Sequence, residues 1–401
     1  MNYQKPVRLF LFGFGILFLS CTVQKKAVTK KDSAFLNLID SNFIDAVAQY
    51  KVLMKNMPED RFPKTYDANN NKLEYSNSAW WCSGFYPGTL LYLFEQTKDT
   101  PVYREALRML KPLEKEQFNK NTHDLGFMMF CSFGNAARLY PTHQYNNILI
   151  NSAKSLSTRF NPKVGCIKSW NSKPGDFIVI IDNMMNLELL FWATRITGDS
   201  SYYQMAVTHA NTTLKNHYRS DFSAWHVINY DPESGAVKEK RTAQGAADTS
   251  TWSRGNAWGL YGWVVMYRET KDRRYLDQAN NVANLLLTHP NLPADKIPYW
   301  DYNAPNIPNA LRDASAASIM ASALLELCRY VDVEKSKAYI STAETILKTL
   351  SSDQYKAKPG TNGGFILLHG VGHMPAGTEV DVPLTYGDYY FIEAMKRYKE
   401  L

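Results

Sequence analysis

The fold of this chain is constrained most by a pair of helices that recurs along the sequence. In each copy a stretch with the apolar period of a helix leads into a short turn with Asp or Thr, then a tyrosine and a second helix with spaced alanines. The clearest copies span residues 190–214 and 259–287, and weaker ones pass through Tyr103, Tyr145 and Tyr339. Stacked helical hairpins bury their apolar faces against one another, so this repeat predicts one continuous helical core.

Apolar periodicity and helix-capping residues predict twelve helices in all. Their expected ranges are 33–55, 84–96, 102–118, 125–138, 145–159, 182–196, 201–217, 254–269, 274–288, 312–330, 335–350 and 386–400. Six pairs can close on themselves, first against last, so that no pair needs a special cap. We therefore predict an all-α fold, a single-domain (α/α)6 toroid (six-hairpin barrel) over residues 33–401, rather than an open solenoid.

Five long segments between the predicted helices are rich in Trp, Gly, Asp and His. They span residues 74–88, 163–182, 220–254, 295–313 and 359–388. Long loops in a compact domain are usually functional. If these segments gather at one mouth of the ring, they form a pocket that is both aromatic and polar, which suits a sugar ligand.

The N-terminus has the pattern of a secretory signal. Lys5 and Arg8 precede the apolar run Leu9–Leu19, which is too short to span a membrane and ends at Ser20 and Cys21. A small residue before a cysteine resembles a bacterial lipobox, although Phe18 stands where leucine is usual. From this pattern we expect a signal peptide over 1–20, lipidation of Cys21 and a lipid-anchored linker over 21–32. The expected location is exported, lipid-anchored and periplasmic.

Net charge gives no sign of a nucleic-acid partner. The formal charge is +7, but residues 1–31 hold six of the 45 basic residues and no acidic one, which leaves 39 basic against 38 acidic residues in the body. A nucleic-acid-binding domain needs a basic stripe of its own. The predicted membrane contact is the lipid anchor alone.

Cysteine spacing argues against a metal centre. Apart from Cys21 the cysteines are Cys82, Cys131, Cys166 and Cys328, with no CxxC and no Cys/His pair at metal-ligand spacing. We therefore predict no metal and no cofactor. Most of these cysteines stand in apolar surroundings, where a buried thiol is common, so we predict no structural disulfide.

Two aspartates stand directly before predicted helices. Asp124 follows His123, and Asp182 follows the apolar run 177–181, which predicts that Asp182 is buried. Aspartate is also a common helix N-cap, which is the structural alternative for each taken singly. A helix dipole lowers a carboxyl pKa by less than about one unit, whereas burial or a second carboxylate raises it by up to about 3–5 units. A buried pair at one mouth can therefore share a proton near neutrality.

Five sequence blocks together resemble glycoside hydrolase family 88, the unsaturated glucuronyl hydrolases. They are 81–88 (Trp-Cys-Ser-Gly-Phe-Tyr-Pro-Gly), 123–128, 181–187, 244–262 and 386–390 (Tyr-Gly-Asp-Tyr-Tyr), in order along the chain. The resemblance implies a six-hairpin barrel and an enzyme that hydrates a C4=C5 double bond. Its substrate is an unsaturated uronyl oligosaccharide left by a polysaccharide lyase, with the unsaturated uronic acid at the non-reducing end.

The resemblance also implies roles for particular residues. Asp182 is the implied acid/base, and Asp124 is its essential carboxylate neighbour. The residues implied to surround the unsaturated uronate are Trp81, His123, Trp170, His226, Gln244, Arg254 and Trp258. Two positions depart from the family pattern, because Ala243 stands where a histidine is frequent and Asn256 where glutamine is usual.

Some residues have structural alternatives. Arg254 can pair with a substrate carboxylate, or form a salt bridge to Asp248 or to another helix start. Trp258 can offer a flat face to a sugar ring or can be plain core packing. The histidines His369 and His373 are four apart, but glycines between them argue against a helical metal site and favour a substrate-facing loop.

Three other functions fit parts of the pattern. The sister family of unsaturated rhamnogalacturonyl hydrolases shares the fold and the chemistry but acts on pectin-derived substrates. An inverting glycosidase on the same barrel also uses two carboxylates, and cleaves a saturated substrate. In a non-catalytic sugar-binding lipoprotein the aspartates are caps and the tryptophans a stacking platform. The glycan, its sulfation and the oligomeric state are left open.

Overall fold

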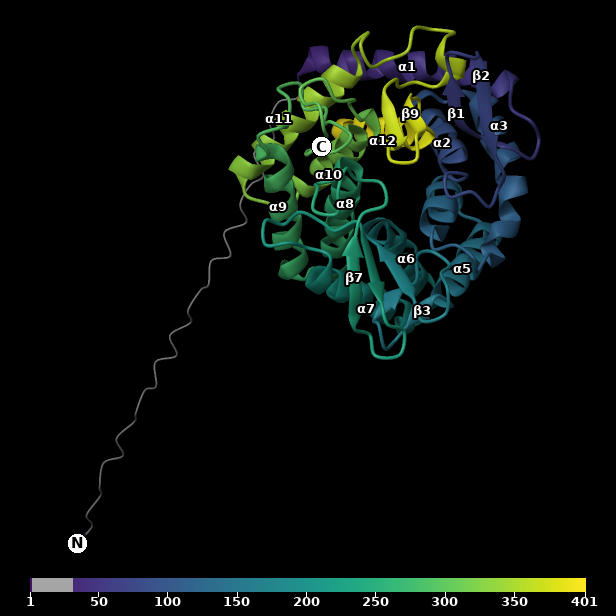
Figure 1. The fold of residues 1–401 in the computed structure, drawn as a ribbon. Coiled ribbons are helices and arrows are strands. Elements are labelled where there is room, and N and C mark those ends of the chain that lie inside the picture. Colours follow the sequence, from purple (N-terminus) through teal and green to yellow (C-terminus); the bar gives the residue numbers. More distant parts are fainter. Residues whose placement is uncertain (2–31) are drawn as a thin grey trace. The chain divides into compact units, whose positions relative to one another are not determined.

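The structure is a computed structural model that describes Met1 and residues 32–401. The predicted signal peptide, the lipidation of Cys21 and nearly all of the linker lie outside the described residues. Lys31–Leu401 form one compact unit, which is mostly helical (Figure 1). Among the described helices, none has both the length and the apolar character that a membrane crossing requires.

Twelve α-helices are present in the described residues, and each overlaps one of the twelve predicted ranges. Their bounds are α1 Ser33–Lys55, α2 Phe85–Thr97, α3 Thr100–Leu113, α4 Asn135–Leu139, α5 His143–Ser157, α6 Leu187–Thr197, α7 Ser200–Asn216, α8 Ser253–Thr270, α9 Arg273–Thr288, α10 Ala314–Leu327, α11 Val333–Leu350 and α12 Thr385–Lys399. The prediction of a helical single domain is confirmed.

Three of the predicted helices contain a stretch that is not α-helical. The third ends in a 3-10 segment, η1 (Glu114–Phe118); the fourth begins with a π-helix, η2 (Gly126–Gly134); and the sixth begins with a 3-10 segment, η3 (Ile181–Asn186). At the start of η2 the N–H of Phe127 donates to the side chain of Asn186 at 3.1 Å. The unusual turns η2 and η3 therefore stand directly after Asp124 and around Asp182, and π-helical turns are frequent at functional sites.

Helices of one pair are joined by tight turns. In three of these turns a residue in the left-handed conformation ends one helix and the next residue, an aspartate, caps the following helix. The three turns are Lys98–Asp99, Gly198–Asp199 and Lys271–Asp272. Because these turns are so short, most of the chain outside the helices is in the segments between the pairs.

Short strands occupy much of the long segments, and the all-α prediction missed them. The strands are β1 Phe62–Asp67, β2 Lys72–Ser76, β3 Phe160–Asn161, β4 Cys166–Ile167, β5 Phe177–Ile180, β6 Val227–Tyr230, β7 Val237–Arg241, β8 Gly370–His373 and β9 Thr378–Val382. They form four small antiparallel sheets, of which β5-β6-β7 joins two of the predicted long segments. Four apolar residues in a row in β5 are buried, which explains why this run is a strand and not a helix.

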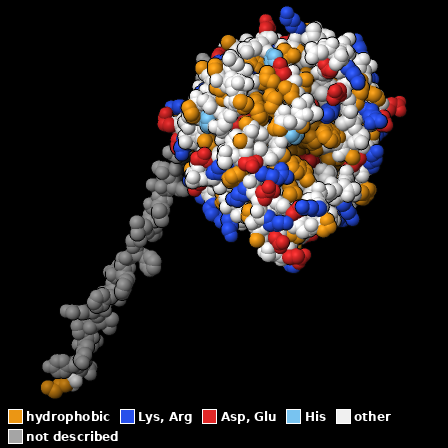
Figure 2. All heavy atoms as spheres, viewed as in Figure 1, with side chains coloured by type: hydrophobic (Ala, Val, Ile, Leu, Met, Phe, Trp, Pro, Cys, Tyr) orange, Lys and Arg blue, Asp and Glu red, His pale blue; other side chains and the backbone are white. Residues whose placement is uncertain are grey.

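The helices that begin at the long segments pack against one another in chain order. α2 contacts η2, η2 contacts η3, and η3 contacts α8, which is followed by α10 and then α12; α12 also contacts α2. Figure 1 shows α1, α3, α5, α7, α9 and α11 along the rim of this unit. The face drawn in Figure 2 is hollowed near its middle, with hydrophobic side chains around the hollow.

Gly84, directly before α2, packs against the backbone of η2. A Cβ at this position would meet the carbonyl oxygens of Met128 and Phe127 at 2.2 and 2.3 Å, so α2 and η2 would have to separate. We expect Gly84→Ala to lower the free energy of unfolding by about 1–3 kcal/mol, as overpacking does, when measured by urea denaturation. The control is Gly387→Ala in α12, whose Cβ would meet Ser315 at an ordinary 3.4 Å. Equal losses in both variants would contradict this prediction.

Candidate active site

A small cavity of about 80 Å³ lies beside the first turns of η2, η3 and α8. Its lining residues are Trp81, His123, Asp124, Phe127, Trp170, Ile180, Asp182, Gln244 and Arg254. Seven of the nine residues predicted for catalysis or substrate binding are among them. The remaining two, His226 and Trp258, lie behind this lining.

The sheet β5-β6-β7 positions Asp182. Ile180 of β5 pairs with Val227 of β6, and the N–H of Ile181 donates to the carbonyl of His226 at 3.0 Å. Asp182 follows at once and His226 directly precedes β6, so the register of the two strands places these side chains side by side. The distance from His226 Nε2 to Asp182 Oδ2 is 3.7 Å.

Neither aspartate of the pair caps its helix through its side chain. No capping hydrogen bond is made at the start of η2 or η3, whereas Asp199 and Asp313 each accept one from a backbone N–H. Asp124 instead accepts weak hydrogen bonds from the side chains of Asn186 (3.4 Å) and Thr122 (3.5 Å). The capping alternative is therefore wrong for Asp124 and Asp182.

Both carboxyl groups are largely shielded from solvent and hold protons unusually tightly. Burial raises the pKa of Asp182 to about 7; the positive charge of Arg254 opposes this, and Asp124 adds to it. Burial likewise raises the pKa of Asp124 to about 7, against the hydrogen bond from Asn186 and the charge of Arg159. Their side chains are 14% and 13% exposed, and both residues line the cavity. Near neutrality this pair can donate a proton, which an ordinary aspartate does not.

His226 is a neutral donor beside Asp182. Burial lowers the pKa of His226 well below its usual value, and Arg254 lowers it further. Its Nδ1 accepts hydrogen bonds from the N–H groups of Ala243 (3.2 Å) and Gln244 (3.3 Å), so its proton is on Nε2. At 3.7 Å this N–H is too far from Asp182 Oδ2 for a hydrogen bond, and neither atom has another hydrogen-bond partner in the described residues.

His123 contacts the other aspartate. Its Nε2 lies 3.2 Å from Asp124 Oδ1 without hydrogen-bond alignment. Burial and the charge of Arg159 lower the pKa of His123 to about 3, so the ring is neutral at physiological pH. The contact is therefore not an ion pair, and Asp124 keeps its raised pKa.

Several buried polar atoms around the cavity have no hydrogen-bond partner within the described residues. They are His123 Nε2, Asp182 Oδ2, His226 Nε2, Trp258 Nε1 and Tyr386 Oη. Buried polar groups are nearly always paired, and an unpaired one calls for a specific explanation. A polar ligand in the cavity supplies that explanation for the groups that reach it.

Arg254 is held by the protein itself. Its guanidinium lies 3.2 Å from Asp313 Oδ2 and donates to the carbonyls of Val371 and Gly372. The predicted salt bridge of Arg254 to Asp248 is therefore wrong. The other predicted alternative, a salt bridge to another helix start, is confirmed, because Asp313 is the N-cap of α10. Since Arg254 still lines the cavity, its charge acts on a ligand there and on Asp182.

The Arg254–Asp313 pair is completely buried, with 2% and 0% of the side chains exposed. Asp313→Asn keeps an acceptor for the cap at Ser315 but leaves the Arg254 charge without its carboxylate. We expect a loss of about 3–5 kcal/mol in the free energy of unfolding, measured by urea denaturation. The exposed pair Lys163–Glu233 is the control, and Glu233→Gln should cost less than about 1 kcal/mol. A loss as small as the control's would contradict the prediction.

The tryptophans divide into walls and support. Trp81 and Trp170 are half-buried and line the cavity; the ring of Trp81 lies 4.9 Å from Tyr386, and that of Trp170 lies 5.9 Å from His226. Trp258 is fully buried and its ring packs 5.0 Å from Phe127, beneath the cavity. Of the two predicted roles for Trp258, core packing therefore applies to its ring.

Asn186 is a functional residue that the sequence reasoning missed. Its Nδ2 donates to Asp124, and its Oδ1 accepts from the N–H of Phe127, so it joins the two aspartate segments. It lies in the quoted block 181–187, where a second amide four residues after Asp182, between methionine and leucine, was the available signal. Asn256, one of the two departures from the family pattern, is also buried. Its Nδ2 donates to the carbonyl of Trp252, and its Oδ1 accepts from the N–H of Ala224.

The predicted loop around His369 and His373 is a hairpin, β8-β9, and not a helix. His369 Nδ1 lies 2.7 Å from Asp381 Oδ1, and the hairpin supplies the two carbonyls that hold Arg254. Over the described residues, no three His, Cys, Asp or Glu side chains are grouped so that they could hold a metal ion. Cys82, Cys131 and Cys166 are free thiols, and the Cys328 thiol donates to the carbonyl of Leu325.

Two buried carboxyl groups facing a tryptophan-walled cavity in a helical domain are the arrangement of a glycoside hydrolase. The chain belongs to Glycosyl Hydrolase Family 88, whose family model matches residues 51–398. It is 44% identical to an unsaturated glucuronyl hydrolase of Formosa agariphila over 99% of both chains.

Solved structures agree with this membership. A crystal structure of an unsaturated glucuronyl hydrolase specific for heparin is 44% identical and superposes with a TM-score of 0.88, over 91% of this chain and 97% of that one. An aspartate-to-asparagine variant of the Streptococcus agalactiae enzyme, complexed with dGlcA-GalNAc6S, is 29% identical. Its TM-score is 0.77, over 90% of this chain and 91% of that one.

Proposed function

We propose that this glycoside hydrolase removes the 4,5-unsaturated uronic acid from the non-reducing end of lyase-generated glycosaminoglycan oligosaccharides. One observation carries the proposal: Asp182 lines the cavity, burial raises its pKa to about 7, and its Oδ2 has no hydrogen-bond partner in the described residues. A protonated carboxyl group of this kind can donate to a carbon–carbon double bond near neutral pH. The names of the relatives favour the glucuronyl reaction over the rhamnogalacturonyl one.

The proposed reaction starts at the enol ether of the unsaturated ring. Asp182 donates its proton to C4, and the positive charge that forms on C5 is shared with the ring oxygen. Water then adds at C5 and returns a proton to Asp182, so that the acid is regenerated. The C5 hemiketal opens to a ketone, and the hemiacetal that this leaves at C1 collapses and releases the neighbouring sugar.

The residues around Asp182 have distinct parts in this scheme. Asp124 raises the pKa of the acid and borders the same cavity. His226 Nε2–H and Gln244 are donors for the uronate, with His123 beside Asp124. Trp81 and Trp170 form the walls, and Trp258 supports Phe127 from below.

Arg254 acts in the proposal through its charge. Because Asp313 and two carbonyls already occupy its guanidinium, it attracts the substrate carboxylate without replacing these partners. It also opposes the rise in the pKa of Asp182. Its stacking between Trp252 and Tyr386, at 4.8 and 5.4 Å from the ring centres, fixes its position.

A heparin-derived disaccharide is the preferred candidate among glycans. The structure described as specific for heparin is 44% identical to this chain, and the one complexed with dGlcA-GalNAc6S is 29% identical. Unsaturated disaccharides from heparin, hyaluronan and chondroitin should be compared through the ultraviolet absorbance of the conjugated double bond. We expect loss of absorbance, fastest with the heparin product. No loss with any unsaturated uronide, or cleavage of a saturated analogue, would favour an ordinary inverting glycosidase instead.

We also propose that the twelve helices form six hairpins closed into an (α/α)6 toroid. The order of contacts from α2 to α12, and the return of α12 to α2, supports closure. The rim position of the alternate helices in Figure 1 supports an inner and an outer layer. In such a ring Asp124 and Asp182 stand at the first turns of neighbouring inner helices, which accounts for their common cavity.

Export and lipid anchoring belong to the same proposal, with residues 1–20 as signal peptide and Cys21 as the lipidated residue of a periplasmic enzyme. The motif around Ser20 and Cys21 supports it. When cells grow with labelled fatty acid, the native chain should carry the label and be recovered in the membrane fraction. The Cys21→Ser variant should not be labelled. Protease should cut the protein only after the outer membrane is opened. Label on the Cys21→Ser variant would contradict the anchor.

A further inference from the structure

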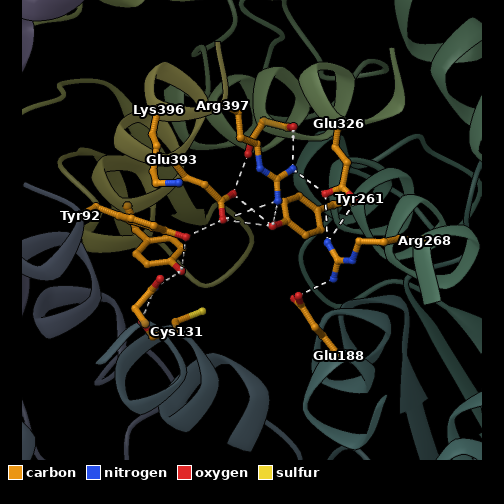
Figure 3. Close-up of polar contacts among 12 residues, drawn as sticks. Tyr92, Cys131, Glu188, Tyr261, Arg268, Glu326, Glu393, Lys396 and Arg397 are labelled. Carbon is orange, nitrogen blue, oxygen red and sulfur yellow. Dashed lines mark hydrogen bonds and ion pairs between the residues drawn. The ribbon is translucent and has the colours of Figure 1, made fainter. Parts of the chain in front are cut away.

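The arginines inside this protein differ in whether a carboxylate neutralises them. Figure 3 shows Arg268 and Arg397 among glutamates with which they form ion pairs, and Arg254 is paired with Asp313 in the catalytic site. Arg159 is half-buried and stands directly before β3. Within residues 32–401 all hydrogen-bond partners of its guanidinium are neutral oxygens, and it forms no ion pair with a carboxylate. A charge shielded from solvent is normally paired, so Arg159 needs a separate explanation.

The guanidinium of Arg159 is fully engaged by these neutral oxygens. Its Nε donates to the carbonyl of Lys168 at 2.8 Å, and its terminal nitrogens donate to the carbonyls of Lys120 at 2.8 Å and Ser169 at 2.9 Å. Both terminal nitrogens also donate to Asn171 Oδ1, each at 3.2 Å. A guanidinium has five N–H donors, and these five hydrogen bonds use all of them. Arg159 therefore has no donor left for a ligand.

These hydrogen bonds join two segments that form walls of the catalytic cavity. The segment 119–124 contributes its last two residues to the cavity lining, and the segment 168–171 contributes Trp170. Arg159 donates to both segments, and its own carbonyl accepts from the N–H of Lys168 at 2.9 Å. The position of the Trp170 ring relative to the catalytic aspartates therefore depends on this side chain.

The charge of Arg159 acts on the Asp124 side of the aspartate pair. Burial lowers the pKa of Arg159, and the carboxylate that opposes this is Asp124. Burial raises the pKa of Asp124, and Arg159 is the cation that opposes that rise. His123, the other titratable group beside Asp124, is neutral. Lys168 donates to the carbonyl of Asp176 at 3.1 Å and adds a second positive charge near Arg159, so it does not offset the first.

Asp182 has a different electrostatic environment. Its nearby cation, Arg254, is paired with Asp313, so a positive and a negative charge lie together on that side of the cavity. Arg159 has no carboxylate in direct contact, and a charge without a counter-ion acts more strongly at a distance. The difference favours the ionised form of Asp124, which leaves the proton of the pair on Asp182.

We propose that Arg159 is a positioning residue of the catalytic cavity. It joins the Trp170 wall to the segment that carries Asp124, and it supplies an uncompensated positive charge on the Asp124 side. Through this charge it keeps Asp124 ionised, and the negative Asp124 keeps the proton on Asp182. The inference rests on the proposed function, because only a reaction that uses the Asp182 proton requires this arrangement.

The test compares Arg159→Lys, which keeps the charge, with Arg159→Gln, which removes it. Rates with the unsaturated disaccharide are measured from pH 5 to 9, with unfolding followed at each pH. In Arg159→Gln, Asp124 stays protonated to a higher pH and raises the pKa of Asp182 less. The alkaline fall in kcat/KM should therefore move to lower pH by about half a unit, and Arg159→Lys should keep its native position. A side chain that only braced the loops would lower activity in both variants without moving the profile.

Asn171→Ala tests the link between the two segments with the charge in place. It removes the acceptor of two of the five hydrogen bonds, so KM should rise several-fold while the alkaline fall stays at its native pH. Arg108→Gln is the matched control. Arg108 also donates to two backbone carbonyls, but it is paired with Glu105 and is not part of the cavity lining. This variant should keep the native KM and the native profile.

Hydrogen exchange followed by mass spectrometry measures the link without any substrate. The segments 119–124 and 168–171 should exchange faster in Arg159→Gln than in the native protein or in Arg108→Gln. A native protein that left every unsaturated disaccharide intact would count against the proposed function, whereas unchanged exchange in Arg159→Gln would overturn the link. A native KM in Asn171→Ala would overturn it too, even if Arg159→Gln failed to fold. An unchanged pH profile in Arg159→Gln, or an equal shift in Arg159→Lys, would overturn the role of the charge.

Discussion

Asp182→Asn is expected to lower the rate of double-bond loss by about 10²–10⁴, because the asparagine has no proton to give to C4. The fold should survive. The Asp182 pKa is raised from its unfolded value to about 7, so between these two pKa values the folded state binds the extra proton and stability falls as pH rises. Removing the ionisable group removes that cost, and the free energy of unfolding near pH 8 should stay level or increase.

The variant separates chemistry from binding. The measurements are absorbance of the conjugated double bond, calorimetric titration with the unsaturated disaccharide and urea unfolding. Asp353→Asn, at an exposed carboxylate far along the chain from the site, is the matched control and should keep native activity. A folded and fully active Asp182→Asn protein would show that Asp182 is not the acid, and an unfolded one would contradict the expected stability.

The sequence predicted the helices well because their evidence is local. Apolar periodicity and the aspartates at 99, 199, 272 and 332 mark helix starts without any knowledge of the partner helix. The same local evidence could not show that Asp124 and Asp182 are not caps. For Asp124 the answer depends on Asn186, which lies 62 residues further along the chain. Asn186 donates to the Asp124 carboxylate and accepts from the N–H of Phe127, 59 residues before it.

The site residues divide in the same way. Trp81, Trp170 and Gln244 were assigned by resemblance and line one cavity with the aspartates. A partner for Arg254 at another helix start was among the predicted alternatives, but Asp313 itself could not be singled out, because it lies 59 residues further along and looks like an ordinary helix cap. The strand pairing of Ile180 with Val227 was hidden as well, since β5 is only four residues long and its partner lies across a whole helical hairpin.

The pH dependence of catalysis should follow the proton on the aspartate pair. The acid form of Asp182 is needed, and its pKa is about 7, so kcat/KM should fall about tenfold per pH unit above 7 and be about a hundredfold lower at pH 9. Because Asp124 has a pKa of about 7 too, the measured value belongs to the pair. His226 and His123 are neutral throughout this range and contribute no transition to it.

Asp124→Asn tests the direction in which Asp124 shifts the pKa of Asp182, and therefore the position of the alkaline fall in activity. Asp124 raises the pKa of Asp182, so its replacement should move the alkaline fall of the residual activity to lower pH. Rates from pH 5 to 9, with unfolding followed by tryptophan fluorescence at each pH, distinguish titration from loss of fold. If the fall moved to higher pH, Asp124 would be lowering the Asp182 pKa. If it disappeared while activity remained, Asp182 could not be the titrating donor, because its proton is lost over this range whether or not Asp124 is present.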